Sequence, residues 1–503
     1  RPGPGVSLLF CVTPARRRCA GGHHGRNYSG INALQNGRKS RYAGKVQVRN
    51  GKGKDMSNLN CRITSRPIAA ILCVFCVLLF CQCSKNHLES AEIHLLLNRH
   101  PFTESILRFI PEYEKQTGVK VSTLLLSEEE YFEKLITELS SRSSFYDLFM
   151  LGFPHLWQYS KAGWLEPLDP YIADPNLTPA DWDPGDFFPE LIACSRWNLK
   201  QGSGMGEGPI WALPVNEEGY VIFYRKDLFE RFRVKPPATY EEVYEAARAL
   251  TRIVDGQQIY GFGHRGVRSW STIHPGYLTA FVSWGARDFD DSMRCAIDSP
   301  QGVEITDLFI RTLREGGPPG WPSYTWYEGK EAFLSGRFAM WFDANHQAAA
   351  FENPAKSQVA GKVGYLLPPA GPDGQIKSST WVWSLAMNSA SGNKDAAWRF
   401  LAWATSKEML QRTVPYENIN PTRRSVWEDP GTVRATNWAG GEYRRTAQLL
   451  LSEYARIRWT PSTYVTQAGD RWAAALQEIY EGKRTAEQAL RGAAVDIDQM
   501  VRK

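Results

Sequence analysis

The sequence predicts an α/β protein that is large enough for two domains. Between residues 92 and 151, short apolar runs alternate with segments whose apolar residues recur at helical spacing, in the order β-α-β-α-β. This order is typical of a parallel sheet whose strands are joined by helical crossovers. Residues 84–503 are enough to bury two hydrophobic cores.

The region from residue 92 to residue 151 contains three predicted strands, at residues 92–98, 119–126 and 147–151. Two predicted helices lie between them, and Gly118 ends the first one. Their apolar positions are Phe102, Ile106, Phe109, Ile110 and Tyr113, and then Tyr131, Leu135, Ile136 and Leu139. Ligands bind beyond the carboxyl ends of parallel strands. The loops 98–100 and 152–155 are therefore candidate site loops.

Residues 208–251 form the most informative stretch of the chain. A short apolar segment, Trp211 to Pro214, is stopped by proline, and the apolar run 220–224 has the character of a strand. A short helix is expected at 226–232. A second helix begins at Thr239, with Glu242 at the spacing of a capping box. Its buried face is expected to comprise Val243, Ala246, Ala247 and Leu250.

Several later segments also have a recognisable pattern. The glycine-rich residues 202–208 lack both the lysine of a phosphate loop and the spacing of a dinucleotide loop, which favours a flexible surface insertion. Residues 269–285 suit a helix after an aromatic loop. Later segments resemble elements of a protein family that is named below. Residues 331–351 resemble its helix, strand and loop, and residues 380–388 resemble one of its strands. Residues 396–401 resemble one of its helices, and residues 473–490 resemble its terminal helix pair.

The first 83 residues differ in composition from the remainder. Residues 1–55 hold twelve Lys or Arg and one acidic residue, a charge of +11, so the whole-chain value of +6 leaves −5 from Met56 onward. The segment is either a basic arm or, as we favour, upstream sequence outside the working protein. The positive net charge of the whole chain is therefore no evidence for a nucleic-acid partner. Residues 56–83 resemble an export signal, with an apolar run from 68 to 80.

Cysteines cluster in that signal. Cys83 follows the apolar run as the lipidated cysteine of a lipoprotein does, although the preceding Phe80, Cys81 and Gln82 are not the small residues usual there. We expect a lipid anchor at Cys83, with plain secretion as the alternative. Only Cys194 and Cys295 follow; they could pair in an oxidising compartment, but we expect two free buried thiols.

A set of motifs resembles the family 1 extracellular solute-binding proteins. The set includes WALP at 211–214, YRKDLF at 224–229, TYEE at 239–242, GRFAMWFDANH at 336–346 and TWVWSLAMN at 380–388. Members capture sugars, oligosaccharides or glycerol phosphates for ABC importers. The resemblance implies the two-lobe, type II periplasmic-binding-protein-like fold, with each lobe a mainly parallel sheet flanked by helices. It implies lobe 1 at 84–218 and 366–410, and lobe 2 at 219–365 and 411–503.

The same resemblance implies an exported protein that binds a carbohydrate or polyol between its lobes. Aromatic faces would cover the CH groups of the ligand, and polar groups would pair with its hydroxyls. Glu218, His346 and Trp383 align best with the family's site, although members often have tryptophan where this chain has His346. We expect only one of Trp381 and Trp383 to face the cleft. The full candidate set is Phe153, His155, Glu217, Glu218, Tyr220, Trp270, His274, Tyr277, Asp343, Asn345, His346, Trp381 and Trp383.

The expected partners are the permease subunits of an ABC transporter and a membrane reached through the lipid anchor, and the expected state is a monomer. No nucleic acid is expected as a partner. We expect no cofactor, no metal and no catalytic residue, because no known nucleophile, phosphate or metal motif occurs and the histidines lack metal-ligand spacing.

Three alternatives stay open. An exported glycosidase could use Glu217, Glu218 and Asp343, although adjacent glutamates on a strand point to opposite faces. A binding subunit could instead serve a membrane sensor, with the same fold and cleft. The ligand could also be a glycerol phosphodiester, for which Arg99, His155, His346 and Arg423 would supply positive charge.

Overall fold

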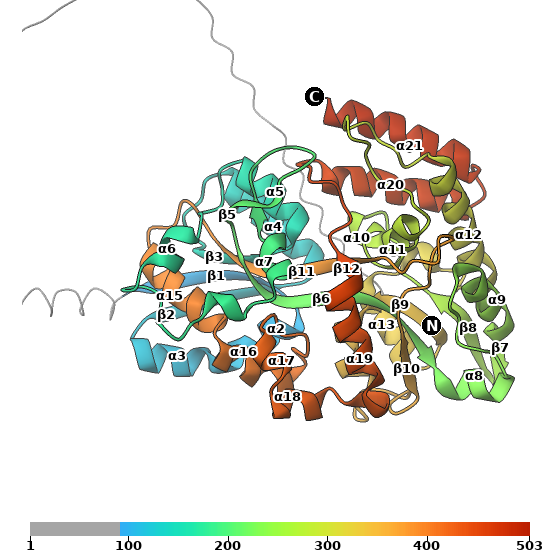
Figure 1. Ribbon diagram of the computed structural model, residues 1–503, viewed down its shortest axis with the longest axis horizontal. Helices are drawn as coiled ribbons and strands as arrows, with labels where there is room; N and C mark the ends of the chain where they lie inside the picture. The colour runs from blue at the N-terminus through green and yellow to red at the C-terminus, as the bar shows by residue number, and fades with distance from the viewer. Residues whose placement is uncertain (1–90, 503) are drawn as a thin grey trace, which may run out of the picture. The chain divides into compact units, whose positions relative to one another are not determined.

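The computed structural model describes residues 91–502, and within them ten strands form one sheet that runs through two lobes (Figure 1). The expected basic segment 1–55, the signal 56–83 and the lipidation site Cys83 lie outside the described residues. No helix among the described residues has the length and apolar character needed to cross a bilayer.

In the first lobe the strand order is β2-β1-β3-β11-β6. Strand β1 lies between β2 and β3 and is parallel to both, as the alternation of the N-terminal region predicts, whereas β11 is antiparallel to β3 and β6. The bounds of these strands are Glu92–Asn98 (β1), Lys120–Leu126 (β2), Leu148–Leu151 (β3), Ser378–Met387 (β11) and Leu213–Arg225 (β6).

The sheets of both lobes are mixed, which differs from the expected mainly parallel sheets. Among the described strands of the second lobe, only the β8–β9 pair is parallel, because β6 enters from the first lobe, β7 and β8 form a hairpin and β10 runs against β6. The bounds are Arg252–Val254 (β7), Gln257–Gly263 (β8), Phe338–Ala344 (β9) and Val363–Leu366 (β10), with Ala455–Arg456 (β12) beside β11.

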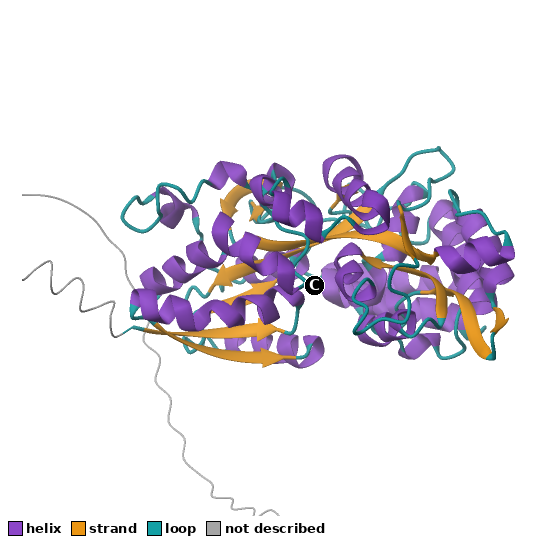
Figure 2. Cartoon of the chain, turned by 90° about the horizontal axis from the view of Figure 1, so that it is seen from below, coloured by secondary structure: helices purple, strands orange, loops and turns teal. Residues whose placement is uncertain are grey.

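The strand β6 runs from the first lobe into the second. Sequence patterns predict two apolar pieces separated after Pro214, but β6 is one continuous strand of 13 residues (Figure 2). Its part up to Gly219 pairs with β11, and its part from Tyr220 pairs with β9 and β10. Pro214 lies at an irregularity of the β6–β11 register, where the missing N–H of proline is tolerated.

The glycine-rich segment is not an irregular loop. The strands Arg196–Trp197 (β4) and Met205–Ile210 (β5) form a separate two-stranded sheet that includes most of it. Gly208 has a φ of 75°, and a Cβ atom there would lie 2.8 Å from the Cα of Asn198. Glycine is therefore required by the close approach of two backbones as well as by the φ angle.

Helices flank the sheet. Those between β1 and β6 are Pro101–Ile106 (α2), Ile110–Thr117 (α3), Glu128–Ser140 (α4), Phe153–Lys161 (α5), Asp169–Ala173 (α6) and Pro189–Cys194 (α7). Those between β6 and β11 are Lys226–Phe232 (α8), Tyr240–Leu250 (α9), Trp270–Ile273 (α10), Gly276–Ser283 (α11), Pro300–Gly316 (α12), Trp326–Leu334 (α13) and Ala348–Phe351 (α14). Those after β11 are Lys394–Ala404 (α15), Lys407–Thr413 (α16), Arg424–Trp427 (α17), Pro430–Ala435 (α18), Glu442–Leu449 (α19), Val465–Tyr480 (α20) and Ala486–Val501 (α21).

Local signals explain where several helices begin and end. Thr239 and Glu242 form the expected capping box of α9, and all four residues of its predicted apolar face are buried. Gly118 ends α3 in the left-handed conformation. The single helix expected between β1 and β2 is divided into α2 and α3, because Pro111 lies in the first turn of α3 and cannot continue a helix from α2.

The chain after β11 returns to both lobes. Helices α15 and α16 pack on β1 and α2 of the first lobe, whereas α19 packs on β10 and α20 packs on α10 and α12 of the second. The expected boundaries between lobe 1 and lobe 2, at residues 218, 365 and 410, remain a proposal. Cys194 and Cys295 are free thiols among the described residues; Cys194 is buried as expected, but Cys295 is only partly buried.

Candidate functional site

A narrow cavity with a free volume of about 20 Å³ lies where the two lobes meet. The first lobe contributes residues from the end of β1, the start of α4 and the strand β11, and the second contributes residues that follow β8 and β9 or lie on α10 and α13. The strand β6, which joins the lobes, contributes Glu218. The lining residues are His100, Glu128, Glu218, Arg265, Trp270, His274, Trp326, His346, Trp381 and Trp383.

Glu218 is the centre of the polar groups in this cavity. Its Oε1 atom accepts a hydrogen bond of 2.9 Å from the indole N–H of Trp383 and lies 3.4 Å from both His100 Nε2 and His346 Nδ1. Burial opposes its ionisation, yet the hydrogen bond from His100 and the positive charge of Arg265 favour the carboxylate, and the pKa of Glu218 lies below its ordinary value. Glu218 is therefore a carboxylate at neutral pH.

Burial holds His346 and His274 in their neutral form. Burial lowers the pKa of His346 to about 4, and it lowers the pKa of His274 well below its ordinary value. His274 Nδ1 pairs with the hydroxyl of Tyr220 at 2.7 Å. At neutral pH these rings offer hydrogen-bonding atoms to a ligand without adding positive charge.

The tautomer of neutral His100 follows from its role at a helix terminus. His100 is the N-cap of α2, and its Nδ1 atom accepts the backbone N–H of Phe102 at 3.2 Å. A neutral imidazole that accepts at Nδ1 carries its hydrogen on Nε2. His100 therefore presents an N–H donor to the cavity, next to Glu218.

His100, Glu218 and His346 place their ligand atoms within 4.8 Å of one another, a grouping that could hold a metal ion and that sequence spacing does not reveal. The arrangement fits a metal poorly, because His100 Nε2 carries a hydrogen and has no lone pair to give. We assign the three residues to hydrogen bonding and assign no metal ion to them.

Arg265 lies in the cavity wall with its charge already compensated. Its Nε and Nη2 atoms donate to both carboxylate oxygens of Asp343, at 2.8 and 2.6 Å, and both side chains are buried. Asp343, a predicted ligand contact, thus lies behind Arg265 and does not line the cavity. Asp343 holds the guanidinium group of Arg265 in position and compensates its positive charge.

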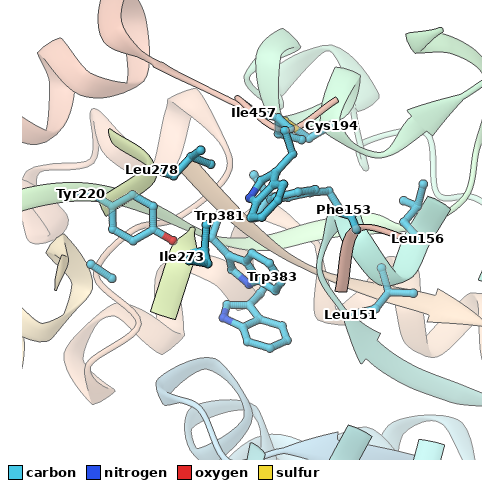
Figure 3. Close-up of a cluster of buried hydrophobic side chains, with 14 of the residues drawn as sticks. Leu151, Phe153, Leu156, Cys194, Tyr220, Ile273, Leu278, Trp381, Trp383 and Ile457 are labelled. Atoms are coloured by element: carbon cyan, nitrogen blue, oxygen red, sulfur yellow. The ribbon is translucent and has the colours of Figure 1, made fainter. Parts of the chain in front are cut away.

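Indole rings form the apolar wall. Trp270 and Trp381 stack with ring centroids 5.1 Å apart. Trp381 meets Trp383 edge to face at 5.2 Å, and Figure 3 shows these two rings side by side. Both tryptophans of β11 line the cavity, so the expectation that only one would face the cleft was wrong. Side chains two residues apart in a strand point to the same face.

Six of the thirteen candidates line the cavity, namely Glu218, Trp270, His274, His346, Trp381 and Trp383. Tyr220 and Phe153 lie behind them, the first against His274 and the second against Trp381. His155 stacks on Phe132 and meets Trp270 edge to face.

The other candidates have partners elsewhere. Glu217 points away from the cavity and accepts the hydroxyl of Thr380 at 3.1 Å, and burial raises its pKa to about 8. Tyr277 pairs with Thr306 in the core, and Asn345 accepts the side-chain N–H of Asn420.

Sequence reasoning missed four lining residues. His100 belongs to a predicted site loop but was not selected, and Arg265 follows strand β8, so the strand-end rule could have found it. Glu128 and Trp326 begin helices α4 and α13, and no sequence signal separates them from ordinary first-turn residues.

Several polar atoms in the cavity wall have no partner among the described residues. They are buried and comprise His100 Nε2, His346 Nδ1 and the indole N–H of Trp381. A buried polar group without a hydrogen bond costs about 1–3 kcal/mol. A ligand with several hydroxyls would satisfy these groups, while its CH groups would pack on the indoles.

The chain is similar to known solute-binding proteins. The profile of the bacterial extracellular solute-binding proteins matches residues 100–411. An erythritol/L-threitol-binding protein of Mycolicibacterium smegmatis is 34% identical over 403 residues, which cover 79% of this chain and 83% of the relative. A mannitol-binding protein of Pseudomonas aeruginosa is 27% identical, over 68% of this chain and 72% of the relative.

A solved structure shares the fold. The solute-binding protein of an ABC transporter from Agrobacterium vitis S4, with bound D-mannitol, superposes with a TM-score of 0.70 at 25% identity. The match covers 82% of this chain and 99% of the other.

Proposed function

The chain belongs to the family of bacterial extracellular solute-binding proteins, and from this premise we propose that it captures a neutral polyol between its lobes for an ABC importer. The two-lobe fold with one shared strand supports capture by hinge closure. Members of this family bind and release their solutes, and no bond is made or broken.

The observation that carries the proposal is the group of unpaired polar atoms around Glu218. A hydroxyl both donates and accepts a hydrogen bond, so one hydroxyl can donate to Glu218 while it accepts from the Nε2–H of His100. The indole N–H of Trp381 can donate to another hydroxyl. A ligand without hydroxyls would leave these groups buried and unpaired, which makes them the source of specificity.

The charges of the cavity favour a neutral ligand over a phosphate ester. Glu218 is a carboxylate, His346 is neutral, and the charge of Arg265 is compensated by Asp343. Of the cations considered for a phosphodiester, Arg99 is exposed and 3.6 Å from Glu104, and Arg423 donates to backbone carbonyls outside the cavity. An anion would therefore meet a carboxylate without a free cation.

The size of the cavity favours a short ligand. Its free volume is about 20 Å³, so any polyol must move the walls apart. A short polyol requires less movement than an oligosaccharide. The names of the relatives, an erythritol/L-threitol-binding protein and a mannitol-binding protein, also support an acyclic polyol.

Capture requires that the ligand stabilise the closed state more than the open state. The polyol meets that condition because its contacts come from both lobes, His100 and Trp381 on one side and His346 on the other. Membership of an extracellular family supports export. The permease partner, the anchor at Cys83 and the monomeric state belong to this proposal.

Thermal unfolding of the purified protein tests the proposal against erythritol, L-threitol, ribitol, D-mannitol, maltose and a glycerophosphodiester. A bound polyol at 100 times its dissociation constant should raise the unfolding free energy by about 2.7 kcal/mol. The shift should disappear in Trp383→Ala and persist in Trp403→Ala, whose indole lies on α15 outside the cavity.

The competing outcomes are distinct. A shift with the phosphodiester alone would replace the neutral ligand by an anionic one. Release of a sugar from a glycoside would identify an enzyme. The absence of a shift with every compound would contradict the proposal.

A further inference from the structure

We propose that Glu128 is a ligand-contacting residue that the first lobe adds to the polyol site only when the lobes close, and that its carboxyl group makes ligand capture depend on pH. This inference rests on the proposed function. It concerns a residue that neither the sequence motifs nor the comparisons single out.

Glu128 reaches the second lobe from the first. It is the first residue of α4, which packs on β1 and β2, and its side chain lines the cavity. Its Oε2 atom accepts a hydrogen bond of 3.1 Å from the indole N–H of Trp326, the first residue of α13 in the second lobe. Separation of the lobes would break this contact.

The contact leaves part of the carboxyl group available. Oε2 pairs with Trp326, and no hydrogen bond to Oε1 occurs among the described residues. The neighbouring cavity residues include Glu218 and Arg265. A ligand hydroxyl beside Glu128 would therefore find an acceptor that is held in place by the opposite lobe.

A role for Glu128 in helix capping does not account for this arrangement. A carboxylate in the first turn of a helix stabilises the helix dipole, but α4 has two further ones, Glu129 and Glu130. Glu130 completes the capping box with Ser127. Glu129 is exposed, whereas Glu128 is partly buried and faces the other lobe.

The environment of the closed cleft also changes the acidity of Glu128. Burial raises its pKa to about 7; Arg265 and Trp326 oppose the increase, and Glu129 of the same helix and Glu218 of β6 add to it. Tyr327 of α13 also faces this carboxyl. We expect an ordinary pKa in the open state, because water would then reach the carboxyl group.

The sign of the pH effect follows from these two states. A group whose pKa is higher in the closed state binds a proton on closure, so closure weakens as the pH rises through about 7. The buried histidines titrate in the opposite direction, because burial lowers their pKa values. A comparison with Glu128→Gln cancels that contribution, since the histidines are the same in both proteins.

The experiment measures the affinity for erythritol, L-threitol and D-mannitol from pH 6.5 to 8.5 by calorimetry in the purified protein. For the polyol that binds, the ratio of wild-type to Glu128→Gln affinity should fall about fourfold across this range, as one group of pKa near 7 requires. Glu128→Ala, which removes the contact, should bind at least tenfold more weakly than the wild type at pH 6.5. Glu133→Gln, which removes an exposed carboxylate further along the same helix, should retain the wild-type affinity and pH dependence.

The experiment distinguishes failure of the inference about Glu128 from failure of the proposed function. If the wild type binds a polyol and both Glu128 variants match it at every pH, the inference about Glu128 is overturned and the proposed function stands. If the wild type binds none of the three polyols, the proposed function is overturned together with this inference. A loss of affinity in Trp326→Phe, which keeps the ring and removes the N–H, would support the contact between the lobes.

Discussion

The indole N–H of Trp383 donates a hydrogen bond of 2.9 Å to Glu218, which links β11 and β6 where the two lobes meet. The bond orients a carboxylate that is only 4% exposed, and it places an apolar ring beside that carboxylate. A polyol needs both features, because each carbon carries a polar hydroxyl and apolar CH groups.

Glu218→Gln should lower the affinity for the bound polyol at least tenfold. The substitution replaces a carboxylate by an amide, whose NH₂ group would face the N–H donors of His100 and Trp383 in one of its two orientations. Calorimetry measures the affinity. The melting temperature without ligand should stay close to that of the wild type, and an unchanged affinity would remove Glu218 from the site.

Asp343→Asn should destabilise the protein by about 3–5 kcal/mol, because it leaves the buried Arg265 without its charged partner. Asp255→Asn is the matched control, since Asp255 also binds an arginine through two hydrogen bonds but is exposed, and there the loss should be about 1 kcal/mol or less. Urea unfolding measures both. Equal losses would mean that burial of the Arg265 pair carries no extra cost.

The buried Glu217 should make stability fall between about pH 5 and pH 8. Burial raises its pKa in the folded protein to about 8, whereas the unfolded chain has the ordinary value of 4.5. The folded state therefore holds a proton that the unfolded state has released, and this stabilisation is lost as the pH rises through 8. Urea unfolding of Glu217→Gln should show a smaller decrease, and an identical profile would exclude Glu217 as the cause.

Gly152→Ala should weaken both ligand binding and stability. A Cβ atom at residue 152 would lie 2.0 Å from the ring of Trp381, so the indole must leave its position in the cavity wall. Gly392→Ala is the control, because no atom lies within 4 Å of the Cβ built there. Melting curves with and without polyol measure both effects, and wild-type binding in Gly152→Ala would show that the position of Trp381 is not critical.

Much of the fold could be predicted because its signals are local. The strands at 92–98 and 120–126, the helix 226–232 and the cap at Thr239 depend on residues within a few positions of one another, and the structure has them at or near the predicted bounds. The predictions that were wrong depend on distant partners. Pro214 could enter a strand because the register with β11 is irregular there, and the second sheet is mixed because β6 is shared between lobes.

The sequence by itself determined the α/β class, the family and the order of the secondary structure, because periodicity, caps and motifs are properties of neighbouring residues. It also placed Glu218 and Glu217 on opposite faces of one strand. Only the tertiary structure decided that His100, Glu128, Arg265 and Trp326 lie with Glu218 in one cavity. It also decided that Asp343 pairs with Arg265. These contacts join residues far apart in the chain, and strand register and the approach of the two lobes set them.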